Sequence, residues 1–225
     1  MYFDYTYILV IIGIVISAIA SARVNSTFRK YSQYCSINRI TAEQCALKIL
    51  HNAGIFDVRI ERIKGNLTDH YSPSEKILRL SDCVFGSTSI AAIGVAAHEC
   101  GHAIQHKVGY LPLKLRSFSV PVANIGSKLS WPIILIGLIF GYLNIAKIGV
   151  FLFLFVVLFQ LITLPVELDA SKRAISVLNN SEMFGGEELK GAKKVLRAAA
   201  MTYVAALCSS ILQLMRFILL TNRKR

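Results

Sequence analysis

The chain has 225 residues, 54% of them hydrophobic, and its mean hydropathy is +0.54. This composition is too apolar for an ordinary soluble protein of this length and favours a membrane protein. The formal net charge is +12, which would suit nucleic acid, but the positions of the basic residues indicate a membrane topology instead. Five cysteines without a CxxC pair exclude a cysteine-based zinc knuckle and fit a reducing compartment.

The N-terminal segment, residues 1–22, is predicted to be a transmembrane anchor. Residues 5–22 are uncharged and apolar, and they are long enough to cross a bilayer as one helix. A cleaved signal peptide would carry basic residues before its apolar run. Here Arg23, Arg29 and Lys30 follow the run, as they do in a retained anchor.

A short helix is expected over residues 41–53. Thr41 and Gln44 have the spacing of a capping box, and Gly54 supplies a C-terminal stop. His51 lies in the last turn, where a cation suits the helix dipole, so we interpret it as structural.

Two short runs with the alternation of strands follow, at residues 57–63 and 76–81. The segment between them is rich in turn-forming residues, so we expect a small antiparallel ribbon. Asp69 and His70 lie in this connecting loop. They are more consistent with a loop-ordering hydrogen bond than with substrate binding or chemistry, although His70 stays open as a candidate oxyanion donor.

Residues 88–107 are predicted to form one helix that carries the sequence H-E-x-x-H. Positions i and i+4 share a helix face, so His98 and His102 can each place a ring nitrogen about 2 Å from one Zn²⁺. Glu99 lies roughly 100° around the helix, where it can reach a water on the metal and act as general base. The alternative is a core helix with two histidines, but it would bury Glu99 without a partner.

His106 extends the histidine series to i+8 and lies about 12 Å along the helix axis from the first histidine. Three helical histidines at that spacing cannot bind one ion. His106 is therefore expected to support the site or to face solvent.

A catalytic zinc ion needs a third protein ligand and an open position. Four acidic residues are candidates: Asp69, Asp82, Glu167 and Asp169. Glu167 lies where the last helix of the hairpin described next leaves the membrane, a depth at which an unpaired carboxylate is costly. We therefore expect Glu167 to be the ligand and Asp169 to support it; the alternative is that both merely mark a cytosolic boundary.

A transmembrane helical hairpin is predicted over residues 119–166. Its two apolar runs break near Asn144–Lys147, and the second run, 148–166, is the clearest span of the chain. Residues 167–198 should then form cytosolic helices that supply the third ligand.

The final segment, residues 199–225, is predicted to be a membrane helix with a basic tail. Residues 199–220 are the weakest candidate span, because Gln213 and Arg216 lie inside it. The tail, residues 223–225, would lie outside the cell if this segment spans. Whether it spans, re-enters or lies in the interface is left open.

The distribution of basic residues predicts the topology. Thirteen of the 25 Lys and Arg residues fall in residues 23–118 and six in residues 167–200. Lysine and arginine excess marks the cytoplasmic side. We therefore expect a multi-pass protein of the plasma membrane with residues 23–118 and 167–198 in the cytosol.

Five further segments of the chain are informative together: LTDHYSPSEKILRLSD, AAHECGHAIQH followed by GYLPLKLRS, VPVANIGSKLSW, LPVELDASKRA and GAKKVLRAAAMTYVAAL. In this order, and over nearly the whole chain, they resemble the bacterial YugP-like membrane zinc metallopeptidases. That family is in turn similar to the HtpX-type membrane gluzincins, in which a glutamate from an E-x-x-x-D element joins H-E-x-x-H. The resemblance implies the motif roles for His98, Glu99 and His102 and the third-ligand role for Glu167. The closing Asp of the element falls on Ser171 here.

These observations predict a mainly α integral membrane protein, with about four transmembrane or membrane-associated helices and a small α+β zincin-like cytosolic domain (residues 23–118). Its predicted function is a zinc metalloendopeptidase with one Zn²⁺ per chain, bound by His98, His102 and Glu167, and with Glu99 as the base. The expected partners are a peptide or membrane-protein substrate and the lipid bilayer, and no nucleic acid.

Two other functions remain as alternatives. One is a catalytically silent zinc-binding scaffold or regulator in the membrane, against which the presence of Glu99 argues. The other is an intramembrane protease of the site-2 type, whose H-E-x-x-H lies inside a spanning helix. Only about ten apolar residues precede His98, and no membrane Asp-Gly motif is present. The sequence does not identify the oxyanion donor, for which Tyr203 is a further candidate.

Overall fold

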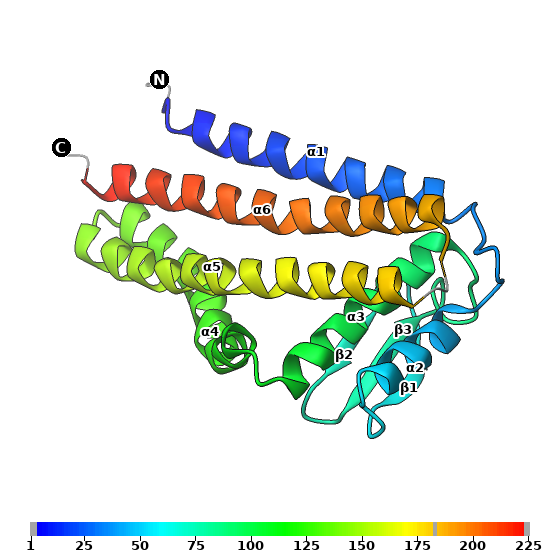
Figure 1. Ribbon diagram of the computed structural model, residues 1–225. Coiled ribbons are helices and arrows are strands. Elements are labelled where there is room, and N and C mark those ends of the chain that lie inside the picture. The colour runs from blue at the N-terminus through cyan, green and yellow to red at the C-terminus, as the bar shows by residue number, and fades with distance from the viewer. Residues whose placement is uncertain (1–3, 182–183, 223–225) are drawn as a thin grey trace. The chain divides into compact units, whose positions relative to one another are not determined.

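The structure is a computed structural model that describes residues 4–181 and 184–222. Most of the described chain is helical (Figure 1). The helices are α1 (Tyr7–Tyr31), α2 (Ala42–Asn52), α3 (Ile90–Lys107), α4 (Leu111–Ile139), α5 (Leu143–Asn180) and α6 (Gly186–Asn222). The strands are β1 (Arg59–Ile63), β2 (His70–Ser72) and β3 (Ile77–Ser81). The helices α1, α4, α5 and α6 are long and apolar enough to cross a membrane. The predicted class, a mainly α membrane protein with a small α+β part, is confirmed.

The chain divides into two compact units. We call the first the apolar helical unit (Met1–Ser21, Lys114–Pro165 and Met201–Arg225). We call the second the α+β unit (Ala22–Leu113 and Val166–Ala200). All residues predicted to bind metal, and the predicted base, belong to the α+β unit.

The sheet of the α+β unit differs from the predicted ribbon. Its strand order is β1-β3-β2, with β1 parallel to β3 and β2 antiparallel to β3. The predicted antiparallel pairing of residues 57–63 with 76–81 was therefore wrong. The turn-rich segment itself contains β2, which folds back onto β3 through a turn with Lys76 at a φ of 55°. Because β2 occupies one side of β3, β1 pairs on the other side and runs parallel.

The core of the α+β unit lies between this sheet and two helices. Leu78 and Leu80 of the central strand are fully buried, together with Ile49 of α2 and Ile93 of α3. Local signals place both helices as the sequence predicts. Thr41 and Gln44 form the capping box of α2. Ser89 caps α3 by accepting a hydrogen bond from the backbone of Ala92 at 3.2 Å.

In the apolar helical unit, a short turn joins α4 to the first part of α5, the region predicted to be a transmembrane hairpin (residues 119–166). The turn lies at residues 140–142, a few residues before the predicted break at Asn144–Lys147. Gly141 explains this position, because its φ of 75° is a conformation that ends helices and favours glycine. Pro165 lies inside α5.

The last predicted span, residues 199–220, lies within the longer helix α6. Ser17 of α1 and Ser209 of α6 are hydrogen-bonded at 2.9 Å between their hydroxyls, and Ser209 also donates to the carbonyl of Gly13. Serine pairs of this kind hold apolar helices together in membranes. The basic tail, Arg223, Lys224 and Arg225, lies outside the described residues.

Candidate metal centre

The candidate metal centre lies in the α+β unit, where α3 crosses residues 166–180 of α5. A Cβ atom added to Gly101 of α3 would lie 2.5 Å from the carbonyl oxygen of Ala170 of α5. The two backbones can approach this closely only because residue 101 has no side chain. Gly101 directly precedes His102, and Ala170 lies one helical turn after Glu167. The close crossing therefore brings the carboxylate of α5 to the histidines of α3.

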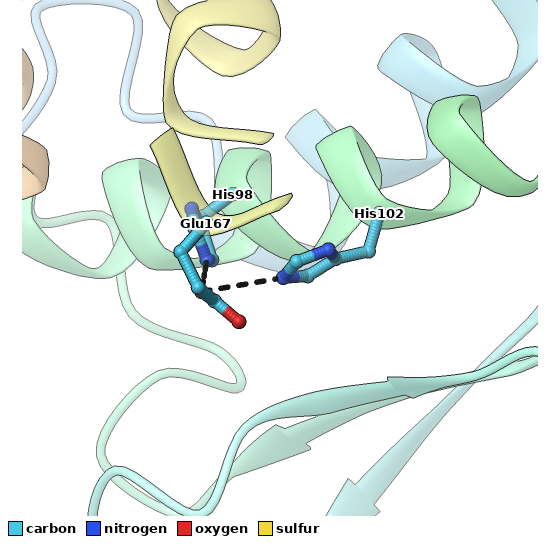
Figure 2. A group of neighbouring side chains, drawn as sticks. All are labelled: His98, His102 and Glu167. Carbon is cyan, nitrogen blue, oxygen red and sulfur yellow. Dashed lines mark hydrogen bonds and ion pairs between the residues drawn. The ribbon is translucent and has the colours of Figure 1, made fainter. Parts of the chain in front are cut away.

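His98, His102 and Glu167 come together at this crossing (Figure 2). The Oε2 atom of Glu167 lies 3.1 Å from Nε2 of His98 and 3.6 Å from Nε2 of His102. One potential ligand atom from each residue lies within 4.8 Å of the other two. Glu167 is only 2% exposed. Two imidazole nitrogens and one carboxylate oxygen are a typical donor set of catalytic zinc sites, so these residues fit a zinc ion.

The electrostatics of the group favour a cation. Burial lowers the pKa of His102, but the hydrogen bond to Glu167 and the negative charges of Glu99 and Glu167 outweigh it and leave that pKa above its usual value. A positive charge between these side chains, either a proton on His102 or a metal cation, is therefore stabilised by the two carboxylates. A zinc ion would take the place of that proton between the same donors.

A network of buried polar groups orients His102. Its Nδ1 atom lies 3.0 Å from Oε1 of Gln105, one turn along α3. The Nε2 atom of Gln105 donates to the carbonyl of Val166 and to Oδ2 of Asp169, both at 2.8 Å. Asp169 was expected to support Glu167. Its contact to Gln105 links it instead to His102.

Gln105 was missed in the reading of the sequence, although a signal existed. Residue 105 shares a helix face with residues 98 and 102, so a glutamine there is a polar group aimed at the same site. It is fully buried in the structure.

Ser171 performs a similar orienting role for the other histidine. Its hydroxyl lies 3.2 Å from Nδ1 of His98. Ser171 occupies the position of the closing Asp in the E-x-x-x-D element. The structure thus places a smaller hydrogen-bonding group at the point where the pattern has a carboxylate, and the ring nitrogen still has a partner.

Glu99 lies beside the group and contacts the sheet. Its Oε2 atom accepts a hydrogen bond from the backbone N–H of Tyr71 at 3.0 Å. Tyr71 is the middle residue of β2, which has a neighbour on one side only. The carboxylate predicted to be the base is therefore held at the edge of the sheet.

The other polar candidates are engaged elsewhere. Asp69 accepts hydrogen bonds from the backbone and hydroxyl of Ser81, in agreement with the loop-ordering interpretation. Asp82 pairs with Arg62.

His70 and His106 also have other partners. His70 lies 2.9 Å from the carbonyl of Thr68, and His106 lies 2.9 Å from the hydroxyl of Tyr71. Within residues 4–181 and 184–222, His98, His102 and Glu167 are the one group of this kind that could hold a metal.

Comparison with known proteins identifies the class. A family model described as "Putative neutral zinc metallopeptidase" matches residues 6–222. The chain belongs to this family of zinc metallopeptidases, as its resemblance to the YugP-like proteins predicts.

A relative in Bacillus subtilis (strain 168), described as "Putative membrane protease YugP", is 43% identical over 201 residues, which are 89% of each chain. No solved structure matches the chain.

Proposed function

We propose that the protein is a zinc metalloendopeptidase with one zinc ion per chain, held by His98, His102 and Glu167. The observation that carries the proposal is the meeting of these three side chains from two helices, with Glu99 next to them and outside the ligand group. Membership of the zinc metallopeptidase family and the membrane relative support the same function.

Each residue of the site would have its own role in peptide hydrolysis. Zinc bound at this site would lower the pKa of a water molecule and polarise the peptide carbonyl. Glu99 takes the proton from the attacking water and passes it to the leaving amine, so that the C–N bond breaks and an acid and an amine form. Gln105 and Ser171 hold the two histidine rings in place through their Nδ1 atoms.

We propose that an extended peptide binds along the free edge of β2. An edge strand offers unpaired backbone groups to an added strand. The N–H of Tyr71, which now donates to Glu99, belongs to this edge. A peptide paired there lies beside the base, as hydrolysis of its backbone requires.

The proposed setting is the cytosolic surface of the plasma membrane. The four apolar helices support a multi-pass protein. The basic residues of segments 23–118 and 167–198 support a cytosolic location for both, with segments 1–22, 119–166 and 199–225 in the membrane. Membrane proteins or their fragments are the substrates that this location supplies. The helix α3 is not among the four candidate spans, which favours a surface site over a site-2-type intramembrane site.

The test measures zinc and proteolysis in the same samples. Detergent-purified wild type, Glu99→Gln and Glu167→Ala are analysed for zinc by elemental analysis and incubated with a fluorescence-quenched peptide library. We expect one zinc per chain in the wild type and in Glu99→Gln, and a loss of zinc in Glu167→Ala. Only the wild type should cleave. A wild type without zinc overturns the proposal, and unchanged biological function of Glu99→Gln would favour the zinc-binding scaffold.

A further inference from the structure

Gln105 is a fully buried polar residue whose amide has all of its contacts inside the candidate metal centre. Its oxygen faces Nδ1 of His102 at 3.0 Å, and its nitrogen faces the carbonyl of Val166 and Oδ2 of Asp169. Val166 directly precedes Glu167 in α5. One side chain therefore contacts a predicted zinc ligand on α3 and the backbone beside the other predicted ligand on α5.

These contacts determine which way the amide points. The carbonyl of Val166 has no hydrogen to donate. Oδ2 of Asp169 also receives a hydrogen bond from Nε of Arg173, so it too is an acceptor. Only the amide nitrogen, with its two hydrogens, can serve both acceptors. The oxygen of Gln105 must then face His102, and the reversed orientation is excluded.

The orientation of the amide in turn determines the proton position on His102. An amide oxygen cannot donate, so Nδ1 of His102 must be the donor in the 3.0 Å contact. A neutral imidazole with its hydrogen on Nδ1 has a free lone pair on Nε2. This Nε2 atom faces Glu167 at 3.6 Å, in the group that could hold a metal.

We propose that Gln105 is a positioning residue for zinc, which sets the tautomer of His102 and ties this ligand to the α5 backbone next to Glu167. The inference rests on the proposed zinc site. The competing explanation is that Gln105 only stabilises the packing of α3 against α5, as any satisfied buried amide would.

Three variants separate these explanations. Gln105→Leu keeps a similar volume and removes the acceptor for His102. The double variant Gln105→Glu with Asp169→Asn keeps an acceptor for His102 and exchanges donor and acceptor between residues 105 and 169, whereas the carbonyl of Val166 loses its donor. Ser89→Ala is the matched control, because it removes the N-terminal cap of the same helix and leaves the His102 contacts unchanged.

The experiment uses the full chain in detergent and measures two quantities for each variant. The first is the zinc dissociation constant, by competition with a chromophoric chelator, and the second is the thermal unfolding temperature of the metal-free protein. We expect Gln105→Leu to weaken zinc binding by about 10- to 100-fold. The double variant keeps the acceptor for His102 and should bind zinc more tightly than Gln105→Leu. Ser89→Ala should lower the unfolding temperature without changing the affinity.

The measurements distinguish a failure of the proposed zinc site from a failure of the proposed role of Gln105. A wild type that binds no zinc refutes the proposed function itself. A wild type that binds zinc, with an unchanged dissociation constant in Gln105→Leu, refutes the role of Gln105 alone. The same holds if the affinities of all variants, Ser89→Ala included, simply follow their unfolding temperatures.

Discussion

We expect two glycines of α3 to respond differently to the same substitution. In Gly101→Ala the new Cβ would lie 2.5 Å from the oxygen and 3.0 Å from the carbon of the Ala170 carbonyl. In Gly94→Ala the nearest atom is Cα of Ala192 at 3.7 Å, which is ordinary van der Waals contact. Because both changes add one methyl group to the same helix, Gly94→Ala is a matched control for Gly101→Ala.

The magnitude follows from these distances. The obstacle at Gly101 is helix backbone, which cannot rotate away, so α3 and α5 must separate by roughly 1 Å to reach ordinary contact. Overpacking of this kind costs about 1–3 kcal/mol, and we expect the upper end. Replacing glycine by alanine in a helix recovers up to about 1 kcal/mol. Gly101→Ala should therefore lower the free energy of unfolding by about 2 kcal/mol. Gly94→Ala should raise it by about 0.5–1 kcal/mol.

The assay is thermal unfolding of the purified protein in detergent, together with zinc affinity. For a chain of this size about 2 kcal/mol corresponds to a shift of roughly 4–8 °C. Zinc affinity should fall in Gly101→Ala, because the separation acts between His102 and Glu167, and it should stay unchanged in Gly94→Ala. Equal unfolding temperatures and equal zinc affinities of the two variants would refute the reasoning.

Four further predictions concern the candidate metal centre and the fold. Ser171→Ala removes the partner of His98 Nδ1 and should weaken zinc binding by up to about 10-fold, measured by chelator competition, while an unchanged affinity would contradict this role. Zinc affinity should rise as pH increases through the raised pKa of His102 and level off above it, because zinc displaces the His102 proton; chelator competition at several pH values measures this. The unfolding free energy of the metal-free protein should have the opposite pH trend. The contribution from protonated His102 is complete below the ordinary histidine pKa and is lost as pH rises through the raised pKa. Denaturation of the metal-free protein at several pH values tests this sign. Thr41→Ala should cost about 0.5–2 kcal/mol of unfolding free energy, measured by denaturation, without affecting zinc.

Local sequence signals predicted the helices that carry the site. The helix α3 begins at a serine cap, and its H-E-x-x-H spacing places two histidines on one face, because the helical period is set by backbone geometry alone. The capping box of α2 is likewise contained within four consecutive residues. Apolar runs long enough to cross a bilayer identify the remaining helices. In hydrocarbon the backbone N–H and C=O groups have no water to bond, so they bond to one another in a helix.

Other features depend on residues far apart in the chain, and no local pattern encodes them. Strand direction is one, since the parallel pairing of β1 with β3 results from the insertion of β2 on the opposite side. The carboxylate of the candidate metal centre is another. Glu167 is 69 residues from His98, and the sequence could only rank it among four carboxylates by its membrane depth and by resemblance.

Within this protein, the sequence by itself determined the membrane class, the helix with its paired histidines and the neighbouring glutamate. Only the tertiary structure decided which carboxylate meets those histidines and which groups orient them. The physical reason is the close crossing of α3 and α5 at Gly101, which brings Glu167 and Gln105 into one buried network. Such a crossing depends on the packing of two distant helices and not on the period of either one.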